Sequence, residues 1–148
     1  MQFKLQILIS IFFVFAGSLN SYAEVPVKIE CSLKIKKQSR SGETTTVLKD
    51  VLLDVVQTSG MTGVISTDDD IRSVVLPKQQ NVIEVINYSD ENRWFFIAKS
   101  QDTKITTTKF MIDRNSGQIL YTNDFNEGAV FTEATGRCFK VDTTKRKF

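Results

Sequence analysis

Four side chains capable of chemistry follow one another between two apolar runs in the segment "KFMIDRNSGQILYTNDF". Asp113, Arg114, Asn115 and Ser116 offer a carboxylate, a cation, an amide and a hydroxyl. Acid–base catalysis by a carboxylate needs a proton-transfer partner within reach, and the sequence near Asp113 offers none. Asparagine followed closely by Gly117 favours a tight turn instead. We therefore interpret Asp113, Arg114, Asn115 and Gly117 as a structural hairpin turn, in which Asp113 accepts hydrogen bonds from the turn amides and Arg114 lies over Asp113.

Three consecutive aspartates, Asp68, Asp69 and Asp70, form the second candidate for a site. Clustered carboxylates suit Ca²⁺, but the glycine and the distal glutamate of an EF-hand loop are missing. Thr67 and Asp70 have the spacing of a capping box, and a downstream proline would end a helix. The segment predicts at most one short helix near residues 68–75, with the three aspartates as the remaining candidates for a metal site.

The composition excludes several kinds of catalytic and metal-binding site. The 148-residue chain has no histidine, which removes the usual proton shuttle and the commonest transition-metal ligand. A Ser-His-Asp or Cys-His nucleophile cannot be assembled, and no phosphate-binding or dinucleotide-binding motif occurs. The balance of 19 basic and 17 acidic residues gives no overall attraction to nucleic acid. We expect no cofactor and no enzymatic activity, although a carboxylate pair acting on a polysaccharide stays open.

The N-terminus has the pattern of a secretory signal peptide. Lys4 precedes an apolar run, and small residues ending at Ala23 suit a cleavage site. We expect residues 1–23 to be removed and residues 24–148 to form a single β-rich domain with no membrane span. The expected location is the periplasm or the medium outside the cell.

Cys31 and Cys138 are the two cysteines of the chain. An exported chain with an even number of cysteines is most simply disulfide-bonded, and two free buried thiols are the alternative. A bridge would tie the first strand to the last. Because it closes a loop over nearly the whole domain, it would contribute about 4 to 5 kcal/mol to stability.

Apolar and polar residues alternate in the segment that contains Cys31, which predicts a half-buried strand with Cys31 on its inner face. The segment "TTTVLKDVLLDVVQ" fits helical spacing as well, but its β-branched residues favour a strand over residues 51–57, in a hairpin with "VIST". In the last segment, Cys138 and Phe139 have opposite parity. Either that strand is covered on both faces, or Gly136 marks a bulge.

The aromatic trio in "NRWFFIAKS" belongs to a strand that follows the turn "SDEN". Trp94 and Phe96 point to one face, and Phe95 and Ile97 point to the other, which predicts a central strand covered on both sides. We interpret the trio as core, in preference to a stacking platform for sugars or bases.

Turn signals recur roughly every ten residues, which predicts a mainly β protein. The expected fold is a single antiparallel β-sandwich or small barrel of about seven or eight strands.

Two short motifs carry a resemblance to a group of proteins. The turn motif consists of Ile112, Asp113, Arg114, Ser116 and Gly117, and the terminal Gly-x-Cys consists of Gly136 and Cys138. With these motifs the chain resembles short exported proteins of Gram-negative bacteria that carry an Ile-(Asp/Asn)-Arg-x-(Ser/Thr)-Gly hairpin. The resemblance covers about the last third of the chain and implies a periplasmic location without implying an activity.

Small size, export, a disulfide and the missing catalytic signatures favour a non-enzymatic binding or inhibitory protein of the bacterial envelope. Its partner would be an envelope protein or polymer. A structural or assembly protein that uses an exposed sheet edge is the alternative. A carboxylate-based hydrolase acting on polysaccharide is the further alternative.

Overall fold

The fold is known from a computed structural model, which describes residues 26–58, 60–76, 82–101, 105–125 and 129–141. The secondary structure of these residues consists of strands and turns without a helix. The strands are β1 (Val27–Gln38), β2 (Thr44–Gln57), β3 (Thr62–Ser66), β4 (Val74–Leu76), β5 (Val82–Asn87), β6 (Arg93–Gln101), β7 (Ile105–Asp113), β8 (Gln118–Phe125) and β9 (Val130–Lys140).

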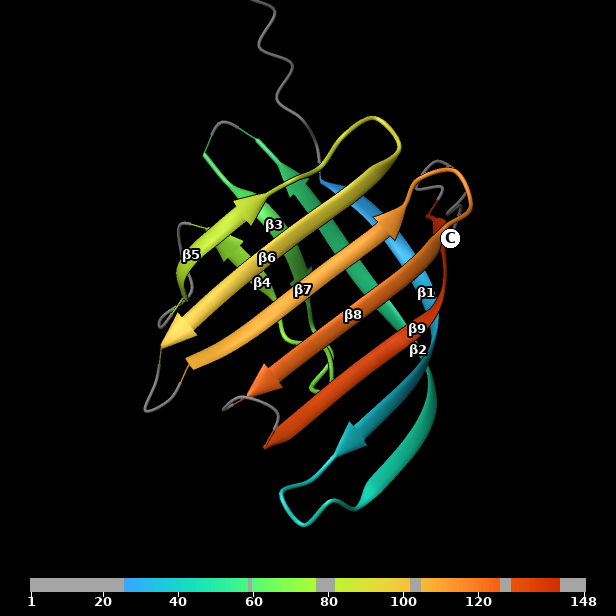
Figure 1. The fold of residues 1–148 in the computed structure, drawn as a ribbon. Helices are drawn as coiled ribbons and strands as arrows, with labels where there is room; N and C mark the ends of the chain where they lie inside the picture. Colours follow the sequence, from blue (N-terminus) through green and yellow to red (C-terminus); the bar gives the residue numbers. More distant parts are fainter. Residues whose placement is uncertain (1–25, 59, 77–81, 102–104, 126–128, 142–148) are drawn as a thin grey trace, which may run out of the picture.

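The nine strands form one antiparallel sheet in the order β4-β3-β2-β1-β9-β8-β7-β6-β5. The edge strands β4 and β5 come close together, so the sheet curls into a nearly closed barrel (Figure 1). The predicted mainly β fold is confirmed as this barrel. Every pairing in this order joins strands that are consecutive in the chain, except the pairing of β1 with β9. The consecutive strands β4 and β5 do not pair, because they are the two edges of the sheet.

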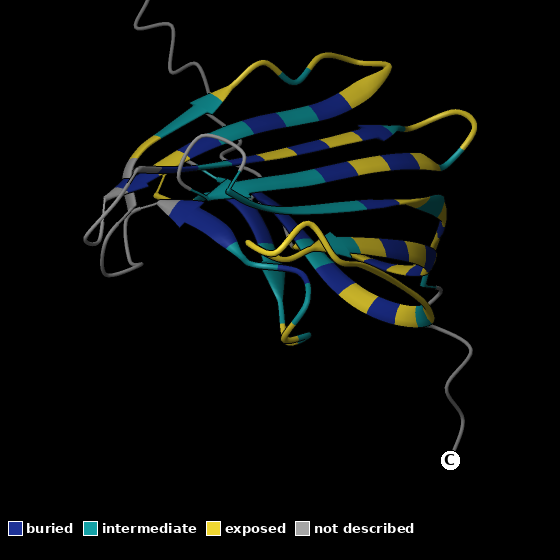
Figure 2. Cartoon of the chain, turned by 60° about the horizontal axis from the view of Figure 1, so that its bottom comes forward, coloured by how far each residue is buried: buried dark blue, intermediate teal, exposed yellow. Residues whose placement is uncertain are grey.

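The alternation predicted around Cys31 is confirmed. Inward residues of β1 are buried and the residues between them are mostly exposed. Figure 2 shows buried and exposed residues alternating along several strands of the sheet. The predicted strand over residues 51–57 is also confirmed, but β2 begins earlier, at Thr44. Its first half is exposed and its second half buries Val51, Leu53 and Val55, because only the second half faces the barrel interior.

The barrel interior is filled by large side chains. Phe110 and Tyr121 lie on adjacent strands with ring centres 4.8 Å apart, and Phe96 lies on the next strand along. All three side chains are fully buried. The interpretation of Trp94 and Phe96 as core is confirmed, whereas Phe95 is only partly buried on the outer face. The expectation that this strand is central and covered on both sides is wrong, because β6 lies next to the edge strand β5. Among the described residues no second layer packs on its outer face, since a barrel has one apolar interior.

The predicted disulfide between Cys31 and Cys138 is confirmed. The two residues lie directly opposite each other on β1 and β9, with their Cα atoms 3.9 Å apart. The bridge therefore joins the first strand to the last, and both cysteines are buried.

Neither of the two alternatives for β9 is correct. The strand pairs without a register shift with β1 and with β8, so Gly136 is not a bulge. Cys138 faces the interior, while Phe139 is 62% exposed on the outer face. The close approach of β1 explains why residue 136 is a glycine. A Cβ atom there would lie 2.0 Å from the carbonyl oxygen of Ser32, so only glycine allows β1 and β9 to approach as they do.

The short helix that the sequence allowed near residues 68–75 does not form. Asp70 N donates to Asp68 Oδ1 over 2.9 Å, which closes a local turn, and β4 follows. Ile71 and Val74 are buried in the core. One helical turn would fix several dihedral angles for a single hydrogen bond, whereas burying these apolar side chains stabilises the turn and strand directly.

Candidate functional site

One end of the barrel is closed by the loop of residues 67–73 between β3 and β4. Ile71 from this loop is 1% exposed. Its neighbour Arg72 donates a backbone hydrogen bond to the hydroxyl of Tyr121 on β8 over 3.0 Å. Burial raises the pKa of that phenol to about 12, so Tyr121 remains neutral and accepts the hydrogen bond at ordinary pH. Among the described residues, the loop therefore packs across this end of the barrel.

The three candidate metal ligands lie in the same loop, but they are not gathered around one point. Asp68 forms an ion pair with Lys49, and Asp70 forms ion pairs with Lys37 and Lys49. Asp69 is exposed. In the part of the chain that the structure describes, no three acidic or cysteine side chains form a metal-binding group. The carboxylates of Asp68 and Asp70 instead fasten the loop to β1 and β2.

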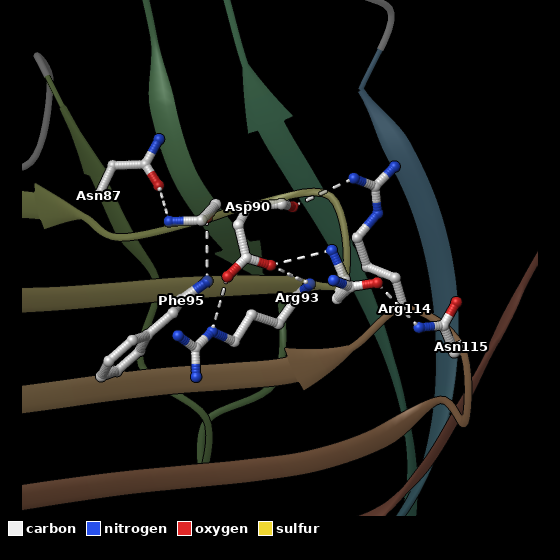
Figure 3. A network of polar contacts seen from close by, with 8 residues as sticks. Asn87, Asp90, Arg93, Phe95, Arg114 and Asn115 are labelled. Carbon is white, nitrogen blue, oxygen red and sulfur yellow. Dashed lines mark hydrogen bonds and ion pairs between the residues drawn. The ribbon is translucent and has the colours of Figure 1, made fainter.

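The opposite end of the barrel carries two turns that are joined to each other. One turn connects β5 to β6 through residues 88–92, and the other connects β7 to β8 through residues 114–117. Arg114 N donates to the carbonyl oxygen of Asn92 over 2.8 Å, and Asn115 Nδ2 donates to Asn92 Oδ1 over 3.3 Å. Figure 3 shows this network. The two turns therefore support each other, and each limits the motion of the other.

Asp113 organises the second turn as predicted. Its Oδ1 accepts hydrogen bonds from the amides of Ser116 over 2.7 Å and Asn115 over 2.9 Å. These bonds, that from Ser116 first, lower the pKa of the Asp113 carboxyl below its usual range. Gly117 completes the turn with a φ of 72°, a left-handed conformation that glycine adopts without strain.

Asp90 organises the first turn in the same way. Its carboxylate accepts from the amides of Asn92 and Arg93 over 2.9 Å each, and from Arg93 Nε over 3.0 Å. The amide of Asn92 is the main cause of the lowered pKa of Asp90. The charge of Arg93 is thereby satisfied within its own turn.

Arg114 does not lie over Asp113 as expected. Its guanidinium carbon lies over the ring of Trp94, 5.1 Å from the ring centre, and its Nη1 donates to the carbonyl oxygen of Asp90 over 3.3 Å. A guanidinium over an indole gains cation–π attraction. The arginine is therefore held above the barrel interior by contacts from the neighbouring turn.

A hollow of about 220 Å³ opens beneath Arg114, and we call it the mouth hollow. Its apolar wall is made by β1, β6 and β7, and Cys138 of the disulfide lies at its side. Three charged residues line it: Arg114, Lys140 and Asp113. The described residues that line it are Val27, Ile29, Trp94, Ile112, Asp113, Arg114, Gly117, Cys138 and Lys140.

Sequence reasoning placed Asp113, Arg114, Asn115 and Gly117 in one turn correctly but missed what they face. Trp94 lies 20 residues before Arg114 in the chain, and Lys140 lies 26 residues after Arg114. No spacing rule connects these three positions. The alternation of residues in its strand did predict that Trp94 points inward. Alternation cannot show, however, that the barrel interior is hollow next to Trp94.

Comparison with known proteins does not assign the chain to a family. No protein-family model matches the sequence, and no curated protein matches it significantly. Among the described residues, no helix has the length and apolar character needed to cross a membrane. The functional interpretation therefore rests on the geometry of the mouth hollow.

Proposed function

We propose that this protein is a non-enzymatic, exported binding or inhibitory protein of the bacterial envelope that holds a partner protein at the mouth hollow. The observation that carries the proposal is the apolar hollow at the open end of the barrel, with two cations at its rim. Apolar concave sites with a few convergent polar groups are the usual form of binding sites, and barrel mouths are common places for them.

The size of the hollow indicates what kind of partner it accepts. Sites that enclose a drug-sized ligand have volumes of about 300 to 1,000 Å³, and the mouth hollow has about 220 Å³. It therefore suits an inserted side chain or chain end of a larger molecule better than a whole small ligand. The two linked turns give this site a preorganised rim, which lowers the entropy cost of binding.

The hydrolase alternative receives less support from the same end of the barrel. A glycosidase needs one carboxylic acid with a raised pKa to protonate the leaving group. Asp90 and Asp113 have lowered pKa values, because turn amides stabilise both carboxylates in the charged form. Their oxygens are used in holding the turns together.

The assembly alternative depends on a free sheet edge. β4 and β5 are the edge strands, and they lie close to each other across the gap in the barrel. β4 is also only three residues long. A short edge that faces another edge offers little room for an added strand, so this alternative is less well supported than binding at the mouth hollow.

Export is the remaining part of the proposal. The buried disulfide is compatible with an oxidising compartment, where such bonds form and persist. A cytosolic location would keep both thiols reduced and would leave β1 and β9 without their covalent link.

In-cell photocrosslinking tests the proposal. A photoreactive residue at exposed Asn115 stands at the rim of the mouth hollow, and one at exposed Ser41 in the β1–β2 turn stands at the other end of the barrel. We expect position 115 to capture one envelope protein reproducibly and position 41 to capture it weakly or not at all. Monomer alone at both positions, or equal capture from both, would contradict binding at the mouth hollow.

A further inference from the structure

We infer that the mouth hollow recognises a carboxylate that a partner polypeptide presents on a short apolar stem. The inference rests on the proposed function and specifies the chemistry of the group that enters the hollow. The carboxylate can come from a C-terminal apolar residue or from a glutamate side chain, and both share the same anionic head and apolar body.

The charges around the hollow favour an anion. Arg114 and Lys140 line it, and neither forms an ion pair with a carboxylate in the part of the chain that the structure describes. Nearby Arg93 differs, because Asp90 pairs with it. Beside an apolar wall, two cations that form no ion pair with a carboxylate among the described residues are suited to an incoming carboxylate.

Asp113 also lines the hollow, and its negative charge must be considered. Its carboxylate oxygen Oδ1 accepts from two turn amides, those of Asn115 and Ser116. The two amide dipoles partly offset the negative charge of the carboxylate, so Asp113 repels an anionic ligand less strongly. The described lining has two positive charges and one negative charge. The N–H groups of Arg114 and Lys140 are more available to a ligand than the carboxylate of Asp113.

Arg114 is positioned to use its donors. Of its five N–H groups, one makes a long hydrogen bond of 3.3 Å to the carbonyl oxygen of Asp90. Contact with the face of Trp94 holds the guanidinium while leaving other N–H groups for a ligand. An arginine that is already held in place loses less side-chain entropy when it binds a carboxylate.

The apolar wall accounts for the stem. Val27, Ile29 and Ile112 line the hollow together with the ring of Trp94. Removing a few methylene groups of a ligand from water against such a wall adds to affinity. A bare anion such as acetate would use only the cations, whereas a carboxylate with an apolar body would use both features.

Three short peptides test the inference on isotope-labelled protein with its disulfide formed. The first is acetyl-Gly-Gly-Leu with a free C-terminal carboxylate, the second is the same peptide as its amide, and the third is acetyl-Gly-Glu-Gly amide. Binding is followed by NMR titration. We expect at least one carboxylate peptide to shift the indole N–H signal of Trp94, and the leucine amide to bind about tenfold more weakly or not at all.

Arg114→Gln provides the matched variant. It should lower the affinity of the bound carboxylate peptide about tenfold while leaving the melting temperature nearly unchanged. Arg40→Gln is the control, because Arg40 is an exposed arginine in the distant β1–β2 turn, and it should leave the affinity unchanged. Lys140→Gln gives a second variant, with a smaller loss expected because a lysine binds a carboxylate as a point charge.

The outcomes show whether the carboxylate comes from a chain end or from a side chain. They also distinguish a failure of the carboxylate inference from a failure of the proposed function. Preference for the leucine acid indicates a chain end, and preference for the glutamate peptide indicates a side chain. Equal binding of acid and amide, shifts remote from Trp94, no shift up to the solubility limit, or unchanged affinity in Arg114→Gln would overturn the carboxylate inference. If position 115 still captures a partner in cells, the proposed function stands although the inference has failed.

Discussion

Removing the disulfide should cost the protein much of its stability. The bridge joins residues that are 107 positions apart, Cys31 and Cys138. In the loop-entropy model, a loop of that length stabilises the folded state by about 5 kcal/mol at 25 °C. Domains of this size have a total stability of about 5 to 15 kcal/mol. The bridge also lies in the β1–β9 pairing, which connects the first four strands to the last five.

The perturbation is the double variant Cys31→Ala/Cys138→Ala. Alanine is preferred to serine because both positions are buried, and a buried hydroxyl without a partner would add its own cost. We expect urea unfolding to give a free energy about 4 to 5 kcal/mol below that of the oxidised wild type. The melting temperature should fall by about 15 to 20 °C, at roughly 4 °C per kcal/mol.

The chemically reduced wild type is the control, and it should resemble the double variant. A loss of less than about 1 kcal/mol in both proteins would refute the reasoning. It would mean that the β1–β9 ladder holds the two halves together without covalent help, or that the unfolded chain is already compact.

Four further substitutions probe two glycines, the pH dependence and the closed end of the barrel. Gly117→Ala should cost about 3 kcal/mol by urea unfolding, because its φ is 72° and its Cβ would lie 2.2 Å from the carbonyl oxygen of Cys138. Gly42→Ala should cost only about 1 kcal/mol, because its φ is also positive but no atom lies within 4 Å of the added Cβ; equal losses would contradict the close contact. A hydrogen bond from Lys37 lowers the pKa of Asp70 in the folded state. The charged Asp70 therefore stabilises the fold above its unfolded pKa of about 3.9. This stabilisation is lost as the pH falls through the folded pKa. Unfolding free energies measured at a series of pH values should therefore decline more steeply below about pH 4 in the wild type than in Asp70→Asn, and parallel curves would rule out this role. Tyr121→Phe should cost about 1 to 3 kcal/mol in urea, because it leaves a backbone N–H of the closing loop without its acceptor, and an unchanged midpoint would show that water replaces the hydroxyl.

Local patterns were sufficient for most strands. Alternation around Cys31 predicted β1, and the "DRNSG" turn predicted the hairpin of β7 and β8. The hydrophobic periodicity did not predict that residues 44–50 belong to a strand. These residues are exposed in β2, so their pattern could not report a buried face, and only pairing with β1 makes them a strand.

The aspartates show where local rules are overridden. Asp70 suggested a helix cap, and Asp68 and Asp70 were candidate metal ligands. Lysines from β1 and β2 bind both carboxylates across the end of the barrel instead. Capping and metal binding are judged from neighbours in sequence. The residues that decided the outcome, Lys37 and Lys49, lie 33 and 21 positions before Asp70 and become its neighbours only when the barrel forms.

The amino-acid sequence by itself determined that the protein is β-rich and favoured a bridge between its first and last strands, because alternation and cysteine number are properties of the chain. The tertiary structure alone decided that Arg114 lies over Trp94 beside Lys140, and that one end of the barrel is closed while the other is hollow. The physical reason is that side-chain parity sets only which face a residue occupies. The curvature of the closed sheet and the packing of its turns set which faces meet, and how much space remains between them.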